Sequence, residues 1–347
     1  MTKDSGQGNQ KSNIIIAVLF LVIIVLAVLL FVKTIAEDEK SETIESTNTA
    51  NDAEDVENVE KWQEGAITYN GRKYCYNTAI KTYLFMGIDN DGVVGKASDG
   101  ISGGQSDSMF LLVENSEEET LSIIAINRNA MTLIDTYDEE GNYLGQITAQ
   151  ICLQHGYGDG MRTSCIRSVD AVSRLFYNLP ISGYIAINMG AIQQMNDSVG
   201  GVTVEVMQDL ENESMGVSLK QGETVTLSGD EAYVYLRSRD IEEFDSATRR
   251  LERQQQYLIG FMAQAKRVAQ ADESAVLRIY NSIEAYLVTN MDFDKLAGEA
   301  LDYTFDESQM YTVPGETIMG DVYEEFYIDE DEFYQMVIDI FYKPVEE

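Results

Sequence analysis

The pattern of apolar and polar residues divides the 347-residue chain into an apolar run near its start, a polar stretch and a long mixed region. The run covers residues 14–32 and contains nineteen apolar residues without a charge. As a helix it would be roughly 28 Å long, about the thickness of a bilayer core. It is longer than the core of about 7–15 residues that signal peptides have, and no clear small-residue cleavage site follows it. We therefore predict an uncleaved transmembrane anchor over 14–33, with a cleaved signal peptide as the alternative.

The charges on the two sides of this run differ in sign. Lys3 and Lys11 precede it, and an acidic group at 37–39 follows it. Positive flanks stay in the cytoplasm, so the remainder of the chain is expected outside the cell. Residues 34–65 are rich in Glu, Asp, Asn, Ser and Thr, a composition that does not bury enough apolar surface to fold. We predict a single-pass membrane protein with four segments: a cytoplasmic N-terminus at 1–13, the anchor at 14–33, an acidic flexible tether at 34–65 and an extracellular folded domain at 66–347.

Three apolar runs follow the tether, at 83–88, 109–113 and 121–126. Their length and continuity are typical of strands that are buried on both faces of a sheet. Asp89 comes directly after the first run, Asp107 just before the second, and Arg128 just after the third. The polar link between the second and third runs favours a hairpin, which brings Asp107 and Arg128 to the same edge of the sheet. If the first strand runs parallel to the third, Asp89 lies at this edge as well.

The rest of the chain alternates helix and strand patterns, so the fold class predicted is α/β: a central mixed β-sheet flanked by helices. Ser228 and Glu231 fit a capping box that starts a short helix ending near Arg237. A longer helix is expected over about 247–269. Further elements are predicted at 164–179 (helix), 184–188 (strand), 202–204 (strand after a Gly-Gly turn) and in three segments beyond 294.

An unusual group of arginines lies at the junction of these two helices. Residues 233–256 contain five of the twelve arginines, in a chain whose formal net charge is −35. The guanidinium group binds phosphate or carboxylate through two parallel hydrogen bonds, which lysine cannot do. The segment therefore predicts an anion site; a surface helix with Glu–Arg pairs is the alternative. The negative net charge argues against binding nucleic acid through a general basic surface.

Other reactive side chains give weaker signals. Cys152 and Cys165 could form a disulfide outside the cell, leaving Cys75 over, or all three could be free thiols. No Cys/His spacing indicates a zinc site. The only histidine, His155, lies in a Gly-rich stretch and is expected to be a loop or packing residue.

The order of these motifs resembles the LytR-CpsA-Psr (LCP) family. The features that carry the resemblance are GID at 87–89, SD at 106–107, Arg128 after a strand, GGV at 200–202, and SGDEAYVYLRSR at 228–239 followed by RRLERQQ. The similarity covers about residues 77–345. It implies a membrane-anchored, extracellular phosphotransferase that moves a glycopolymer, such as a teichoic acid, from a polyprenyl diphosphate carrier onto peptidoglycan.

The resemblance also implies roles for particular residues. Asp89 and Asp107 match the family's acidic residues that hold Mg²⁺ beside the diphosphate. The other matches are the family's arginines on the diphosphate oxygens and the glutamine next to them: Arg128, Arg237, Arg239, Arg250 and Gln254. The apolar interior between sheet and helices would hold the polyprenyl chain.

Two departures from the family pattern concern the chemistry. The usual Arg-Asp pair after the third strand is Arg128-Asn129 here, and asparagine cannot act as a base. Asp245 lies five residues before Arg250 instead of the usual three. The general base stays unassigned, with Asp107 and Asp245 as candidates. The alternative function is a polyprenyl-diphosphate-binding sensor or scaffold with little turnover.

Overall fold

The computed structural model describes residues 66–239, 243–272, 274–291 and 305–345. Its centre is a six-stranded sheet with the order β13-β8-β3-β4-β5-β14. Pairs β3–β8 and β5–β14 are parallel, whereas the other neighbours are antiparallel, so the sheet is mixed as predicted. The bounds are β3 Ile80–Ile88, β4 Ser106–Asn115, β5 Thr120–Ile126, β8 Gly183–Asn188, β13 Leu287–Thr289 and β14 Met310–Thr312.

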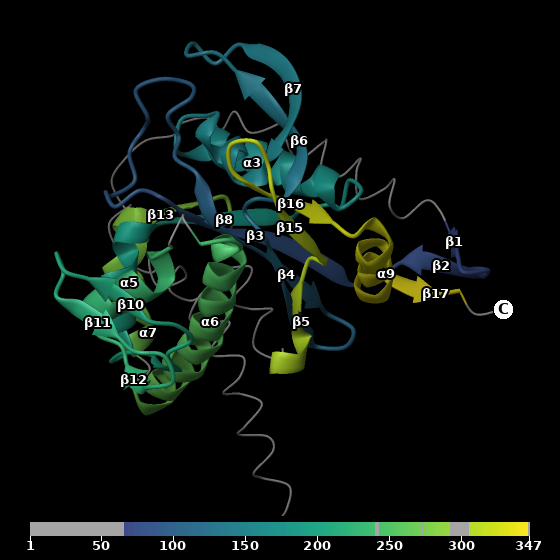
Figure 1. Ribbon diagram of the computed structural model, residues 1–347. Coiled ribbons are helices and arrows are strands. Elements are labelled where there is room, and N and C mark those ends of the chain that lie inside the picture. Colours follow the sequence, from purple (N-terminus) through teal and green to yellow (C-terminus); the bar gives the residue numbers. More distant parts are fainter. Residues whose placement is uncertain (1–65, 240–242, 273, 292–304, 346–347) are drawn as a thin grey trace, which may run out of the picture.

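Both faces of this sheet are covered, because the side chains of its central strands alternate between two apolar cores. Phe110 and Leu112 of β4 belong to the core on one face, and Met109 and Leu111 belong to the other. Figure 1 shows α6 (Ser246–Ala271) on the first side and α3 (Arg162–Leu175) on the opposite side. Continuous burial on two faces explains why the three apolar runs predicted these strands correctly.

The paired strands β3 and β4 contain one irregularity that matters for function. Gly87 pairs with Ser108, but the next residue, Ile88, pairs with Ser106, so Asp107 is an extra residue without a partner opposite it. Such a β-bulge redirects a side chain locally. Asp107 therefore lies within β4 and not before it, which corrects the expectation that the strand begins after this residue.

The helices follow the predicted pattern with adjusted ends. The capping box of Ser228 and Glu231 is formed, and it begins α5 (Gly229–Arg237). The helix predicted over 164–179 ends earlier, at Leu175, because Tyr177 and Asn178 adopt positive φ angles of 58° and 65°. The other α-helices in the described residues are α4 (Ile192–Ser198), α7 (Ser274–Ile283) and α9 (Glu330–Phe341).

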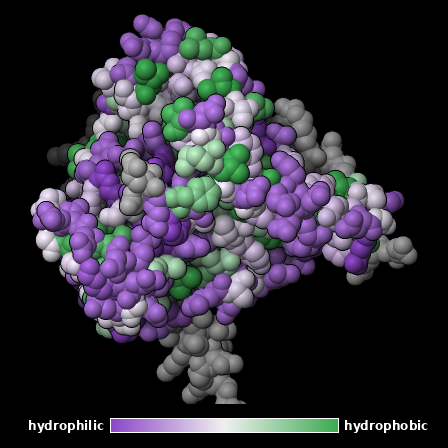
Figure 2. All heavy atoms as spheres, viewed as in Figure 1, coloured by the Kyte–Doolittle hydropathy of each residue, from purple (hydrophilic) through white to green (hydrophobic). Residues whose placement is uncertain are grey.

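Smaller two- and three-stranded sheets surround this framework. Figure 1 shows the hairpin of β6 (Met131–Tyr137) and β7 (Tyr143–Gln150) projecting from the sheet beside α3. On the face in Figure 2, hydrophilic side chains cover most of the surface. The remaining elements are β1 Ile67–Tyr69, β2 Arg72–Tyr76, η1 Ile151–Gly156, η2 Met189–Ala191, β9 Thr203–Glu205, β10 Leu210–Asn212, β11 Val217–Leu219, β12 Thr224–Thr226, η3 Glu284–Tyr286, η5 Glu307–Gln309, β15 Gly315–Met319, β16 Glu324–Ile328 and β17 Tyr342–Pro344.

Some predictions concern segments that the structure does not describe, and one concerns the state of the cysteines. The predicted anchor at 14–33, the predicted tether at 34–65 and the first of the three segments predicted beyond 294 lie outside the described residues. No helix in the described part of the chain is long and apolar enough to cross a membrane. Cys75, Cys152 and Cys165 are free thiols, so the disulfide alternative is not realised.

Candidate functional site

The centre of the candidate site is the carboxylate of Asp107, which lies between two arginines from different elements. Arg250 Nη1 on α6 donates to Asp107 Oδ2 at 2.8 Å, and its Nη2 is 3.3 Å from the Asp107 carbonyl oxygen. Arg128 Nε, just beyond β5, lies 3.1 Å from Asp107 Oδ1. The Arg250 side chain is 5% exposed and the other two are 12% exposed. One negative and two positive charges therefore share a nearly buried position, with a positive excess.

Asp89 lies at the same edge of the sheet, where the sequence predicted it. Its backbone N–H donates to Gln105 O at 3.0 Å, and Gln105 N–H donates back to Asp89 Oδ1 at 2.6 Å. Burial by the surrounding atoms raises the pKa of Asp89 despite that hydrogen bond, and the charge of Asp107 acts in the same direction. Gly104, with φ at +80°, passes close by, because an added Cβ would lie 3.1 Å from Asp89 Oδ1.

Arg237, the last residue of α5, makes an ion pair that the sequence did not predict. Its Nη1 lies 2.7 and 2.9 Å from the two carboxylate oxygens of Asp91, and Tyr233 donates its hydroxyl to the same carboxylate at 2.7 Å. Gly190 permits this arrangement, because a Cβ there would lie 2.0 Å from Asp91 O. Both members of the pair are partly exposed, so Arg237 lies at the rim of the site.

Arg239 completes the positive group without an ion-pair partner among the described residues. Burial lowers the pKa of Arg250, and the positive charges of Arg128 and Arg239 act in the same direction, against the ion pair with Asp107. Arg239 therefore lies close enough to Arg250 for the two charges to interact. The four arginines predicted to contact an anion, Arg128, Arg237, Arg239 and Arg250, surround one region.

Arg253 has a different role from its helical neighbours. Its Nε donates to Tyr235 O at 2.8 Å, its Nη1 donates to Gln208 Oε1 at 2.7 Å, and its Nη2 donates to Ser238 O. The residue is 1% exposed, and burial lowers the pKa of its guanidinium to about 10. Arg253 thus holds the C-terminal end of α5, which carries Arg237 and Arg239.

The alternative interpretation of segment 233–256, a solvated surface helix with Glu–Arg pairs, describes one of its five arginines. Arg249 pairs with Glu243 at 2.7 Å, with both side chains more than a third exposed. Arg250 and Arg253, on the same helix, are instead buried. The segment as a whole is therefore not a solvated surface of ion pairs.

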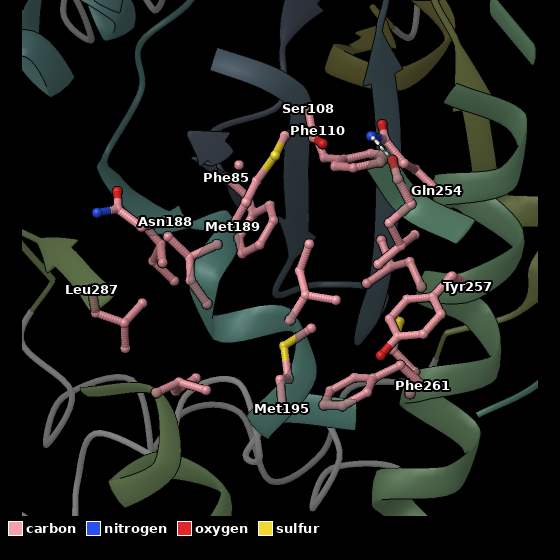
Figure 3. A pocket seen from close by; sticks show the side chains of 18 of the residues that line it. Phe85, Ser108, Phe110, Asn188, Met189, Met195, Gln254, Tyr257, Phe261 and Leu287 are labelled. Carbon is pink, nitrogen blue, oxygen red and sulfur yellow. Dashed lines mark hydrogen bonds between the residues drawn. The ribbon is translucent and has the colours of Figure 1, made fainter. Parts of the chain in front are cut away.

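An apolar cavity of about 140 Å³ begins beside the charged group. Ser108, which follows Asp107, and Gln254, one turn after Arg250, line its polar end. Figure 3 shows Gln254 and Tyr257 of α6 facing Phe85 of β3 and Met189 of η2 across the hollow. Gln254 Nε2 donates to Leu236 O at 3.2 Å, whereas its buried Oε1 has no partner among the described residues. The cavity thus offers an apolar interior with a polar acceptor at its charged end.

The two aspartates are suitable ligands for Mg²⁺, which binds one or two carboxylates together with water and phosphate oxygens. Asp107 Oδ1 is buried and accepts no hydrogen bond from the described residues, although Arg128 is near it. Asp89 Oδ1 receives one backbone hydrogen bond. No cluster of three or more Asp, Glu, His or Cys side chains suited to a metal occurs in the described part of the chain. The donor set fits a metal that also uses ligand oxygens.

The two residues that depart from the family pattern have structural contacts. Asn129 is buried, its N–H donates to Asn127 Oδ1 at 2.9 Å, and its carbonyl oxygen accepts from Phe326 N at 3.0 Å. Asp245 is the N-cap of α6 with φ at 61°, and its Oδ1 accepts from the Thr317 hydroxyl at 2.6 Å. The carboxylate of Asp245 thus connects the start of α6 to Thr317, whereas these contacts of Asn129 use only its main chain.

His155 supports the turn that carries Gly104 and Gln105, in agreement with its predicted packing role. Its ring Nδ1 lies 3.1 Å from Gly104 O, its Nε2 lies 3.9 Å from Cys165 Sγ, and the side chain is fully buried. Burial lowers the pKa of His155 from 6.5 to about 4, so the folded state holds the neutral ring.

This burial predicts a pH dependence of stability. The unfolded chain binds a proton near pH 6.5 and the folded chain only near pH 4, so stability is lost as the pH falls through this window. The full loss is about 3 kcal/mol in the free energy of unfolding. Urea denaturation between pH 7 and 4 should show a shallower decline in His155→Gln than in the unchanged protein. Identical slopes would contradict the assignment of a buried neutral ring.

Sequence reasoning missed three contact residues of the site: Asp91, Gln105 and Cys152. Asp91 follows Asp89 by two residues, and this spacing was the one available signal. Gln105 and Cys152 contact Arg128 through its Nη2, the second at 2.9 Å from Sγ. Gln105 lies in the irregular segment before β4 and Cys152 lies in the short helix η1, and hydrophobic periodicity predicts the position of neither.

Comparison with known proteins finds relatives that are named as teichoic acid transferases. Polyisoprenyl-teichoic acid–peptidoglycan teichoic acid transferase TagU of Halalkalibacterium halodurans is 31% identical over 136 residues, which are 39% of this chain and 40% of that protein. The protein of the same name from Oceanobacillus iheyensis is 30% identical over 72% of this chain and 71% of its own length. The first of these matches thus spans less than half of the relative.

Solved structures share the fold. Protein gbs0355 of Streptococcus agalactiae has a TM-score of 0.60 at 19% identity, over 76% of this chain and 87% of that chain. Bacillus subtilis TagV has a TM-score of 0.56 at 21% identity, over 75% and 95%. A family model described as the LytR_cpsA_psr family matches residues 34–339. This chain therefore belongs to the LytR_cpsA_psr family.

Proposed function

We propose that this protein transfers a glycopolymer from a polyprenyl diphosphate carrier onto peptidoglycan during cell-wall assembly. The observation that carries the proposal is the position of the Arg128–Asp107–Arg250 group at the polar end of an apolar cavity. A lipid diphosphate has the same two parts, a strongly charged head and a long apolar chain. The relatives named as polyisoprenyl-teichoic acid–peptidoglycan teichoic acid transferases support the choice of donor and acceptor.

The arginines would bind and orient the diphosphate. Arg250 and Arg128 are fixed by Asp107, and Arg253 fixes the segment that carries Arg237 and Arg239. Fixed guanidinium groups stabilise charge that develops on a departing phosphate without reorganising. Gln254, with a free acceptor atom, lies where the head group meets the lipid chain.

Asp89 and Asp107 would hold Mg²⁺ beside the diphosphate. When bound, the ion would offset negative charge on the phosphoryl oxygens. Without it, the two carboxylates would repel the diphosphate. The raised pKa of Asp89 agrees with a carboxylate that gains from a nearby cation.

The transfer itself replaces the phosphoanhydride bond of the donor by a phosphoester bond to the acceptor. A hydroxyl of peptidoglycan attacks the phosphorus that bears the glycopolymer, and the bond to the polyprenyl phosphate breaks. The chain's own residues hold the donor, exclude water on the cavity side and stabilise the leaving phosphate. The residue that accepts the hydroxyl proton stays unassigned.

The proposal includes a membrane location, with residues 14–33 as a single-pass anchor and the domain at 66–347 outside the cell. A reporter fused to the C-terminus should be accessible from outside intact cells, because the positive flank of the apolar run favours a cytoplasmic N-terminus. Protease accessibility measures this, and a chain without residues 1–33 is the control. Recovery of the full-length chain in the cytoplasmic fraction would contradict the anchor.

One assay tests the proposed reaction against its alternatives. The purified protein is mixed with a polyprenyl-diphosphate-linked glycopolymer and Mg²⁺, with and without peptidoglycan. Covalent transfer that requires peptidoglycan supports the transferase. Release of free glycopolymer phosphate without the acceptor indicates a hydrolase, and saturable binding without either product indicates the sensor or scaffold.

A further inference from the structure

Arg128 is the arginine of the site whose guanidinium lies against the side chains of three residues at once. Its Nε lies near Asp107 of β4, and its Nη2 donates both to Gln105 Oε1 and to Cys152 Sγ. Burial raises the pKa of Cys152, which keeps the thiol neutral despite its cationic neighbour. Among the described residues, none accepts a hydrogen bond from Arg128 Nη1. The side of the guanidinium that carries Nη1 is therefore available to a ligand.

Gln105 connects this arginine to Asp89. Its main chain pairs with Asp89 in both directions, through bonds of 3.0 and 2.6 Å, while its side-chain oxygen accepts from Arg128. The adjoining backbone is fixed on its other side, because Gly103 N donates to Gly156 O at 3.0 Å. Movement of Gln105 would therefore displace an aspartate and an arginine of the site together.

The chemistry of an amide suits such a link. A carboxylate at this position would orient Arg128 but also neutralise it, as Asp107 already does in part. An amide oxygen accepts the hydrogen bond without adding a negative charge, so the guanidinium keeps its attraction for a phosphate. The half-buried position of Gln105 limits competition from water.

We infer that Gln105 is a positioning residue for the transfer reaction: it fixes the guanidinium of Arg128 with Nη1 toward the diphosphate and couples that orientation to Asp89. The inference rests on the proposed function. Arg128 is the residue that contacts the substrate, and Gln105 acts through it.

Two substitutions of Gln105 test separately the orientation of the Arg128 guanidinium and the charge beside it. Gln105→Met is similar in length and uncharged but offers only a weak sulfur acceptor, so it should lower kcat about tenfold while KM stays within about threefold. Gln105→Glu keeps the acceptor and adds a negative charge, so it should raise KM about tenfold and affect kcat less. Gln193→Met makes the same change on α4, where Gln193 donates to Asp230 at 2.6 Å, and should leave both constants unchanged.

The measurement is the rate of transfer to peptidoglycan as a function of donor concentration, with circular dichroism to check folding. The inference is overturned if folded Gln105→Met retains kcat within about twofold, or if Gln193→Met shows the same loss. The inference is also overturned if both Gln105 variants lower kcat by the same factor and raise KM by the same factor. A purely structural role would produce that pattern.

A second readout keeps failure of the inference distinct from failure of the proposed function. If the unchanged protein transfers nothing, the proposed function fails, and calorimetric titration with inorganic pyrophosphate and Mg²⁺ then decides the role of Gln105. Binding by the unchanged protein that weakens about tenfold in Gln105→Glu but less than about threefold in Gln105→Met supports the inference. Equal binding by the two variants, or no binding by the unchanged protein, overturns it.

Discussion

Replacing Arg250 by lysine is expected to slow glycopolymer transfer by about ten- to a hundred-fold. Arg250 uses two nitrogens on Asp107, one on the carboxylate at 2.8 Å and one on the carbonyl oxygen at 3.3 Å. Lysine keeps the charge but loses the planar fork, so it cannot hold Asp107 and a phosphate oxygen in the same geometry. Single-turnover transfer rates measure the effect.

The neighbouring residue gives a matched control. Arg249 lies on the same helix, pairs with Glu243 at 2.7 Å and is 37% exposed in its side chain. Because exposed ion pairs contribute less than about 1 kcal/mol, Arg249→Lys should change the rate less than about twofold. Equal losses in the two variants, or full activity in Arg250→Lys, would remove Arg250 from the site.

Replacing Arg253 by lysine is expected to lower the free energy of unfolding by about 3 kcal/mol or more. Arg253 donates to the carbonyl oxygens of Tyr235 and Ser238 and to Gln208, in a position that is 1% exposed. A lysine ammonium cannot reach all three acceptors, which leaves buried carbonyl oxygens without a donor. Urea denaturation with circular dichroism measures the loss.

Arg267, on the exposed face of the same helix, is the control for this change. Its Nη2 donates to Gln264 Oε1 at 2.5 Å, one turn away. Arg267→Lys should alter stability little, because an exposed contact within one helix is worth only a few tenths of a kcal/mol. If Arg253→Lys were as stable as Arg267→Lys, the assigned anchoring of α5 would be wrong.

The contacts of Arg253 could not be predicted from helical periodicity. In projection, Arg253 lies about 60° around the helix from Arg250. The projection gives a direction but not the element that lies there. The C-terminal end of α5 occupies that side, and its free carbonyl groups attract the guanidinium.

The central strands were predictable because their sequences are buried on both faces. The continuous apolar runs identified β3, β4 and β5, and the capping box identified α5. The neighbours of β3 and β5 in the sheet, β8 and β14, depend on long crossovers that local patterns do not specify. The bulge at Asp107 depends on the register of two strands, so it was also not predictable.

The residues of the site also divide into those that the sequence pattern predicted and those that it did not. Asp89, Asp107 and Arg128 meet because strand ends share an edge of the sheet, which the order of strands and charges indicated. Asp91 contacts Arg237 through its carboxylate from an irregular segment, and Gln105 contacts Asp89 through its main chain. Such contacts depend on backbone angles in irregular segments, including the positive φ of Gly104, and polar residues in those segments carry no periodic signal.

A crystal structure of the protein with a polyprenyl diphosphate would show whether the arginine group binds the diphosphate and the apolar cavity takes up the lipid chain. We expect electron density for both phosphates beside Arg128 and Arg250, and for the lipid between Phe85 and Tyr257. Density for the diphosphate away from these arginines, or for the lipid outside the cavity, would contradict this expectation.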